Sequence, residues 1–154
     1  MNRTQAKQYN VTSLAYIGDA VYELKIRELV LTGALGPEDA EVDTSAFRIS
    51  KPGSIKNAGL AHKEAVRFVS SNGQALAARA MCEQGFLTEE EERILKRGRN
   101  HRATSRPANA DPRKYKWATG FESLIGFLHL VCDYERIDEI VREAIRIIAS
   151  APKK

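Results

Sequence analysis

Cysteine, strand-forming patterns and long apolar runs are all scarce in this chain of 154 residues. Its two cysteines, Cys82 and Cys132, are far apart and match no metal-binding or redox spacing. Both stand among apolar residues, so we expect them to be reduced core residues of a cytoplasmic protein. No apolar run approaches the roughly 18 residues of a membrane span, and residues 1–10 lack the apolar centre of a signal peptide. These absences argue against a secreted, disulfide-rich or membrane protein.

Helical patterns dominate in place of strands. Apolar residues recur at steps of three and four over most of the chain. We therefore expect an all-α fold of five to seven helices, in a single domain over residues 1–154. The expected helices run from an N-cap at Asn10, Thr12 or Ser13 to about Leu31, from His62 to Cys82 with a break at Ser71-Asn72-Gly73, from a Thr88–Glu91 capping box to Asn100, from Tyr115 to Cys132, and over Ile137–Ile148.

The first long helix carries two carboxylates four residues apart, Asp19 and Glu23. Residues at this spacing share a helix face, so their like charges repel. The apolar residues Leu14, Ile17, Val21 and Leu24 predict the buried side of the same helix. The acidic pair is either a solvated face or a site for a hard metal ion.

A third carboxylate, Glu122, stands in the most apolar of the expected helices. A carboxylate in such surroundings is costly unless it is paired or bound to a cation. The sequence alone leaves a structural salt bridge and a metal ligand equally open.

Basic residues are concentrated between Arg93 and Lys116, where nine Lys and Arg face one acid, Asp111. The rest of the chain has 15 basic and 19 acidic residues. Residues 101–114 also lack an apolar period and are expected to form a loop. A solvated charged loop is the simple interpretation, but so concentrated a charge favours contact with a polyanion.

Three segments, in this order along the chain, carry a resemblance to a known family. Tyr16–Val21 (YIGDAV) resembles the signature helix of the ribonuclease III family, and Ala118–Gly126 (ATGFESLIG) resembles its second metal-binding helix. Between them, Leu95–Asn100 (LKRGRN) resembles the basic segment of the short Mini-III branch. That branch is a catalytic domain without a double-stranded-RNA-binding domain, and residues 39–60 are longer here than in that branch, which indicates an insertion.

The resemblance implies specific metal ligands. Asp19 and Glu122 match the family's ligands and are expected to bind one Mg²⁺, for which Mn²⁺ should substitute, with Glu23 in a supporting role. The longer ribonuclease III pattern has two further acids, at the positions of Ala15 and Thr119 in this chain. The Mini-III branch shows the same reduction.

The resemblance also implies the activity: a homodimeric endoribonuclease that hydrolyses double-stranded RNA to 5′-phosphate and 3′-hydroxyl ends during 23S ribosomal RNA maturation. The residues expected to contact RNA are Lys96, Arg97, Arg99, Asn100, His101, Arg102, Arg106, His62 and Lys63. Two alternatives stay open, a non-catalytic module that binds double-stranded RNA and a helical interaction protein whose basic loop aids solubility.

Overall fold

A computed structural model describes residues 1–35, 40–41, 58–102 and 111–152 of the chain. The described residues form seven helices and one pair of two-residue strands, which agrees with the expected all-α class. The helices are α1 (Arg3–Lys7), α2 (Val11–Thr32), α3 (Ala58–Val69), α4 (Ser71–Glu83), α5 (Glu89–Arg99), α6 (Pro112–Leu130) and α7 (Tyr134–Ser150). Strands β1 (Ala34–Leu35) and β2 (Ala40–Glu41) pair antiparallel directly after α2. The insertion expected at residues 39–60 falls largely outside the described residues.

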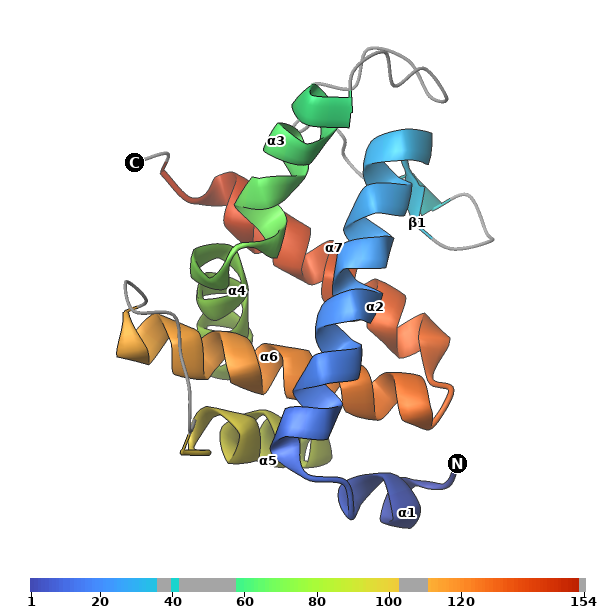
Figure 1. Cartoon of the computed structure of the whole chain (residues 1–154), viewed down its shortest axis with the longest axis vertical. Helices are drawn as coiled ribbons and strands as arrows, with labels where there is room; N and C mark the ends of the chain where they lie inside the picture. The colour runs from blue at the N-terminus through green and yellow to red at the C-terminus, as the bar shows by residue number, and fades with distance from the viewer. Residues whose placement is uncertain (36–39, 42–57, 103–110, 153–154) are drawn as a thin grey trace.

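Helix α6 is the centre of the molecule. It packs against α2, α4 and α5, and α2 crosses it near its middle (Figure 1). Its buried side chains share one core with α2, α4 and α7. The most completely buried of the large side chains include Tyr22, Phe68, Phe121 and Phe127. No helix in the described parts of the chain is both long and apolar enough to cross a bilayer.

Local signals in the sequence set most helix ends. Asn10 caps α2, because its side chain accepts from the amide of Ser13 at 2.8 Å, and Gly33 ends the helix at a left-handed φ of 73°. The expected break in the second helical segment is present, but it lies at Ser70, which caps α4, and Ser71-Asn72-Gly73 form the first turn of that helix. The capping box at the start of α5 is confirmed as well, since Thr88 and Glu91 bond each other's backbone amides.

The expected buried side of α2 is partly wrong. Leu14 is fully buried, but Leu24 is 55% exposed. Besides Leu14, the buried residues of α2 include Ala15, Gly18, Tyr22, Ile26 and Leu29. The sequence pattern missed this because a glycine and a tyrosine fill the positions where α2 meets α6.

Two further expectations need correction. Helix α6 starts at Pro112, not Tyr115, because Asp111 accepts from the amide of Arg113 and caps the helix; proline suits the first helical position. Cys132 is exposed at a left-handed φ of 59° between α6 and α7, so it is no core residue, while Cys82 is half-buried.

Candidate active site

Two glycines bring α2 and α6 into backbone contact. A methyl group on Gly18 would lie 1.7 Å from the carbonyl oxygen of Glu122, and one on Gly126 would lie 1.9 Å from the carbonyl oxygen of Leu14. No side chain larger than hydrogen fits between the helices at these positions. The close approach holds Asp19, the residue after Gly18, beside Glu122 across the crossing.

Asp19 and Glu122 form a pair of like charges at this crossing. Their carboxyl groups lie close enough for each to affect the pKa of the other. Burial and the charge of Asp19 raise the pKa of Glu122 to about 8, although a hydrogen bond from Gln74 lowers it. Asp19 reaches the surface, but partial burial and repulsion by Glu23 also raise its pKa. Such a pair is stabilised by a cation between the two groups.

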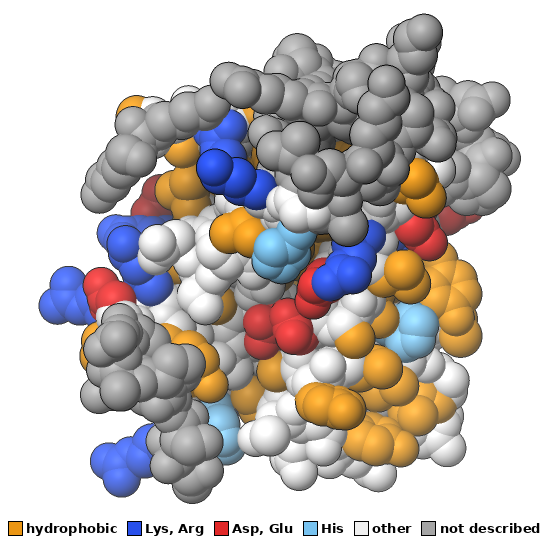
Figure 2. Space-filling view, turned by 45° about the horizontal axis from the view of Figure 1, so that its top comes forward, with side chains coloured by type: hydrophobic (Ala, Val, Ile, Leu, Met, Phe, Trp, Pro, Cys, Tyr) orange, Lys and Arg blue, Asp and Glu red, His pale blue; other side chains and the backbone are white. Residues whose placement is uncertain are grey.

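Glu23 lies one turn beyond Asp19 on α2. Its carboxylate is 2.5 Å from the guanidinium of Arg27, four residues further along the same helix. The repulsion expected between Asp19 and Glu23 is thus partly offset by Arg27, although Glu23 still raises the pKa of Asp19. Figure 2 shows acidic side chains gathered in the middle of one face of the molecule, with basic side chains above them and to the left.

Gln74 on α4 is a site residue that the sequence reasoning missed. It is only 1% exposed, and its amide nitrogen donates to the carbonyl of Val69 at 3.2 Å. The same side chain hydrogen-bonds Glu122. Its Oε1 is buried and has no partner among the described residues. The signal in the sequence was an amide directly before the apolar run Ala75–Ala78.

The two positions that lack acids in this chain are closed to metal binding. Ala15 is buried, and the hydroxyl of Thr119 donates to the carbonyl of Tyr115 at 2.9 Å. Across the described residues, no group of three or more His, Cys, Asp or Glu side chains could hold a metal ion. Asp19 and Glu122 still suit Mg²⁺, which keeps several waters and needs only one or two protein carboxylates besides substrate oxygens.

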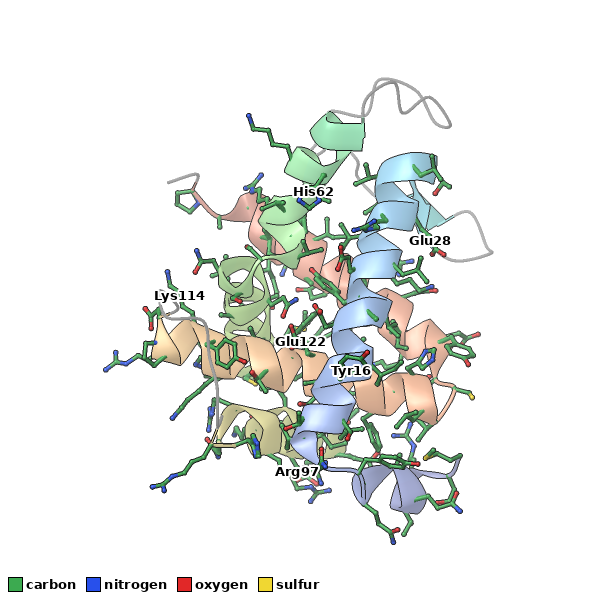
Figure 3. The ribbon with its side chains drawn as sticks, viewed as in Figure 1. Tyr16, Glu28, His62, Arg97, Lys114 and Glu122 are labelled. Atoms are coloured by element: carbon green, nitrogen blue, oxygen red, sulfur yellow. The ribbon has the colours of Figure 1, made fainter. Side chains whose placement is uncertain are left out.

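The expected RNA-contacting residues divide into two groups. Arg97 donates to the carbonyls of Lys7 at 2.8 Å and Tyr9 at 3.1 Å, so it ties α5 to the segment between α1 and α2. Lys96 pairs with Glu92 at 2.9 Å on the same helix. Figure 3 shows Arg97 next to α1, at the edge of the molecule, whereas Glu122 lies in the centre between α2 and α4. Arg97 and Lys96 therefore already have partners within the protein.

The residues of the second group are exposed to solvent or lie beside a groove. Arg99 stacks on Trp117 and donates to the side chain of Asn100 at 3.1 Å. The other described members are exposed: His62 and Lys63 on α3, and His101 and Arg102 after α5. Arg106 lies outside the described residues.

Comparison with known proteins identifies a family that this chain matches. The Ribonuclease III domain matches residues 12–133. The Mini-ribonuclease 3 of Enterococcus faecalis is 38% identical over 96% of this chain and 97% of its own length. That of Clostridium tetani is 36% identical over 92% of this chain and 80% of its own. A crystal structure of a protein from Fusobacterium nucleatum superposes with a TM-score of 0.67 at 26% identity, covering 90% of this chain and 93% of that one.

Proposed function

Because the chain belongs to the ribonuclease III family and is an endoribonuclease of that type, we propose that it hydrolyses double-stranded RNA with Mg²⁺ held by Asp19 and Glu122. The products are a 5′-phosphate and a 3′-hydroxyl end. The observation that carries this proposal is the convergence of Asp19 and Glu122 from two different helices, without a Lys or Arg ion-paired to either in the described parts of the chain.

The residues of the site fit this chemistry in distinct roles. Asp19 and Glu122 would hold the ion, and Gln74 would orient Glu122 through its hydrogen bond. The free Oε1 of Gln74 is an acceptor that a metal-bound water could use. When bound, Mg²⁺ polarises a phosphoryl oxygen and lowers the pKa of a bound water, the two requirements of phosphodiester hydrolysis.

The substrate follows from the family and from the charge. A-form RNA is recognised mostly through its shape, phosphates and 2′-hydroxyls. The basic residues around α5 and the start of α6, which include the half-buried Arg99 and the exposed Arg102, Arg113 and Lys114, suit contact with phosphates. The chain's relatives carry the name Mini-ribonuclease 3, and maturation of 23S ribosomal RNA in the cytoplasm is the role we propose for this protein.

A homodimer would place two sites on one duplex, so that each cuts one strand. An apolar stripe on α2 supports this assembly: Tyr16 is 83% exposed and Leu24 is 55% exposed, with Ala20 between them. Tyr16 faces outward from α2 (Figure 3). An exposed apolar stripe next to a catalytic residue is typical of a face that another chain covers. Replacing Leu24 with Glu should yield a monomer in sedimentation experiments, while an unchanged mass would remove this face from the interface.

The direct test is cleavage of a long RNA duplex by the purified protein, with Mg²⁺, Mn²⁺ or EDTA, followed on a denaturing gel. We expect cleavage with either metal and none with EDTA. Asp19→Asn and Glu122→Gln should each reduce the rate by at least roughly a hundredfold, because each removes a charge that positions the ion. Glu135→Gln, which neutralises an exposed acid on α7, is the matched control and should keep full activity.

The same variants separate catalysis from binding. If Asp19→Asn binds the duplex as tightly as the wild type but does not cut it, the carboxylates act in catalysis alone. Wild-type cleavage rates in Asp19→Asn or Glu122→Gln would refute the proposed site. Binding without any cleavage by the wild-type protein would instead favour a non-catalytic RNA-binding module.

A further inference from the structure

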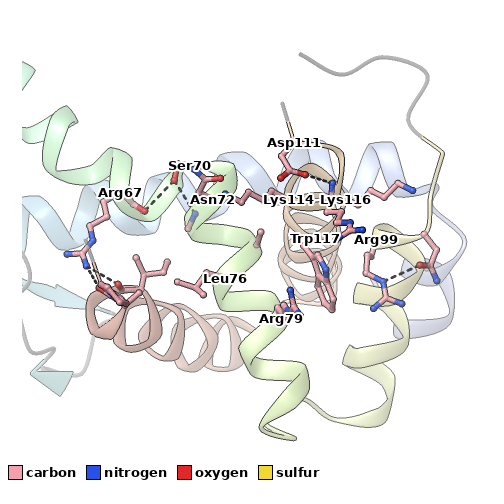
Figure 4. A pocket seen from close by; sticks show the side chains of 17 residues that line it. Arg67, Ser70, Asn72, Leu76, Arg79, Arg99, Asp111, Lys114, Lys116 and Trp117 are labelled. Atoms are coloured by element: carbon pink, nitrogen blue, oxygen red, sulfur yellow. Dashed lines mark hydrogen bonds between the residues drawn. The ribbon is translucent and has the colours of Figure 1, made fainter. Parts of the chain in front are cut away.

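A groove of about 910 Å³ lies between α4, the end of α5, the start of α6 and the end of α7 (Figure 4). We call it the basic groove, because six basic residues and one acid, Asp111, line it. The basic residues are Arg67, Arg79, Arg99, Arg113, Lys114 and Lys116. The volume falls within the roughly 300–1,000 Å³ of ordinary ligand sites.

Most of the charge in the basic groove is not neutralised within the protein. The described residues offer no ion pair to Arg113, Lys114 or Lys116, all of which are exposed. The one acid, Asp111, is already an N-cap acceptor for α6. Arg79 pairs with Glu83 at 3.2 Å, but both side chains are about two-thirds exposed, so solvent screens that pair. The groove therefore attracts a chain of phosphates.

The groove also holds planar surfaces. The guanidinium of Arg99 lies 4.7 Å from the ring centre of Trp117, which is half-buried. Leu76, an exposed apolar residue on α4, lines the same groove. Nucleobases stack on aromatic rings and on guanidinium planes. A base within a duplex already stacks on its neighbours, so only an unpaired base can stack here.

The basic groove adjoins the acidic pair. Trp117 precedes Glu122 by five residues on α6, a rise of roughly 8 Å along the axis. On α4, Gly73 lines the groove while the next residue, Gln74, hydrogen-bonds Glu122. A strand leaving the carboxylates therefore has a short path into the groove.

We propose that the basic groove binds an unpaired stretch of RNA that flanks the duplex being cut, with a base stacked on the Arg99–Trp117 platform. The inference rests on the proposed function, since it takes the flanked duplex to be the substrate. It assigns a role to Trp117 and Leu76, neither of which was expected to contact RNA, and a specific site to Lys114 and Lys116 of the basic segment.

The protein carries its own probe for this site, because Trp117 is its single tryptophan. RNA duplexes of equal length would be compared in EDTA, one blunt-ended and one with a short unpaired oligouridine flank. The flanked duplex should quench the tryptophan fluorescence and bind roughly tenfold more tightly, as expected for stacking of one base on an aromatic ring. Equal affinity and equal quenching with the two duplexes would overturn the proposal and assign the groove to the duplex backbone.

Two sets of variants locate the effect, with binding followed by anisotropy of labelled RNA. Trp117→Leu should bring the affinity for the flanked duplex down to that for the blunt one. The double variant Lys114→Ala, Lys116→Ala changes only exposed side chains. It should weaken binding of the flanked duplex more than binding of the blunt one. Arg93→Ala, which removes an exposed basic residue outside the groove, is the control. It should change the affinity for both duplexes by the same factor. Retention of the flank preference in both groove variants would rule out this site.

Cleavage with Mg²⁺ separates the two proposals. If both duplexes are cut at the same rate and bind equally, the groove proposal fails and the nuclease stands. If the flanked duplex binds more tightly but neither duplex is cut, the groove stands as an RNA-binding site and the nuclease proposal fails.

Discussion

Glu91 and Glu122 are two carboxylates set among apolar side chains, and their partners differ in charge. Burial alone would raise the pKa of Glu91, but hydrogen bonds from Arg136, at 2.8 and 2.9 Å, and from the Thr88 amide hold it below its usual value. Glu122 faces a second carboxylate instead, and its pKa is raised to about 8. A buried carboxylate with its cation already in place is part of the scaffold. One that faces another acid needs a cation from outside, which is the property of a metal site.

The first prediction exchanges each of these acids for its amide. Glu91→Gln should destabilise the fold by roughly 2–3 kcal/mol, because the partly buried guanidinium of Arg136 then keeps only the exposed Glu139 as an ion-pair partner. Glu122→Gln should leave the metal-free protein as stable as the wild type or more so, because it removes a repulsion, and should abolish cleavage. Urea unfolding of both variants in EDTA checks this order. A large loss of stability in Glu122→Gln would show that its carboxylate is structural.

The second prediction adds the missing cation. Mg²⁺ at a hundredfold excess over its dissociation constant should stabilise the wild-type protein by about 2.7 kcal/mol. Asp19→Asn should lose most of this gain. Gln74→Leu should weaken Mg²⁺ binding by roughly tenfold, as loss of a hydrogen bond that orients a ligand does. Thermal unfolding at several Mg²⁺ concentrations measures this stabilisation in the wild type and in both variants. If Mg²⁺ raised the unfolding temperature of Asp19→Asn as much as that of the wild type, the ion would bind elsewhere.

The third prediction concerns a substitution that separates α2 from α6 at the acidic pair. In an ordinary helix, alanine is more stable than glycine by about 1 kcal/mol. Gly18→Ala should instead cost roughly 1–3 kcal/mol, because the new methyl group overlaps the Glu122 carbonyl. It should also reduce cleavage, since Asp19 moves with the backbone. A gain in stability would mean that α2 and α6 do not meet at this glycine.

The fourth and smallest expected effect is a dependence of the stability of the fold on pH. The folded pKa of Glu91 lies below its unfolded value, so the stabilisation it gives is complete above the unfolded pKa, near 4.5, and is lost as the pH falls through the folded pKa. Stability in EDTA should therefore decline below about pH 4.5 more steeply in the wild type than in Glu91→Gln. Parallel pH profiles for the two proteins would contradict the assignment.

Sequence reasoning was most successful where the signal was local. The cap at Asn10, the stop at Gly33 and the Thr88–Glu91 box depend on a few neighbouring residues, and all were confirmed. The break expected at Ser71-Asn72-Gly73 lies slightly earlier, at Ser70. The motif comparison also placed Asp19 and Glu122 correctly in helices. It failed where burial depends on a distant partner: Leu24 looked like core, and Gln74 was overlooked, because no local pattern says which residue faces α6.

Composition and spacing by themselves determined that this chain is helical, where α2 and α5 begin and end, and that its positive charge is concentrated in one segment. Only the tertiary structure decided which charges are satisfied. It gave Glu91 an arginine and Glu122 an aspartate, and it set Arg97 against the backbone of Lys7 while Lys114 remained free of an ion pair among the described residues. The reason is physical: propensity and capping act within a few residues, whereas the cost of a charge depends on every group that folding brings around it.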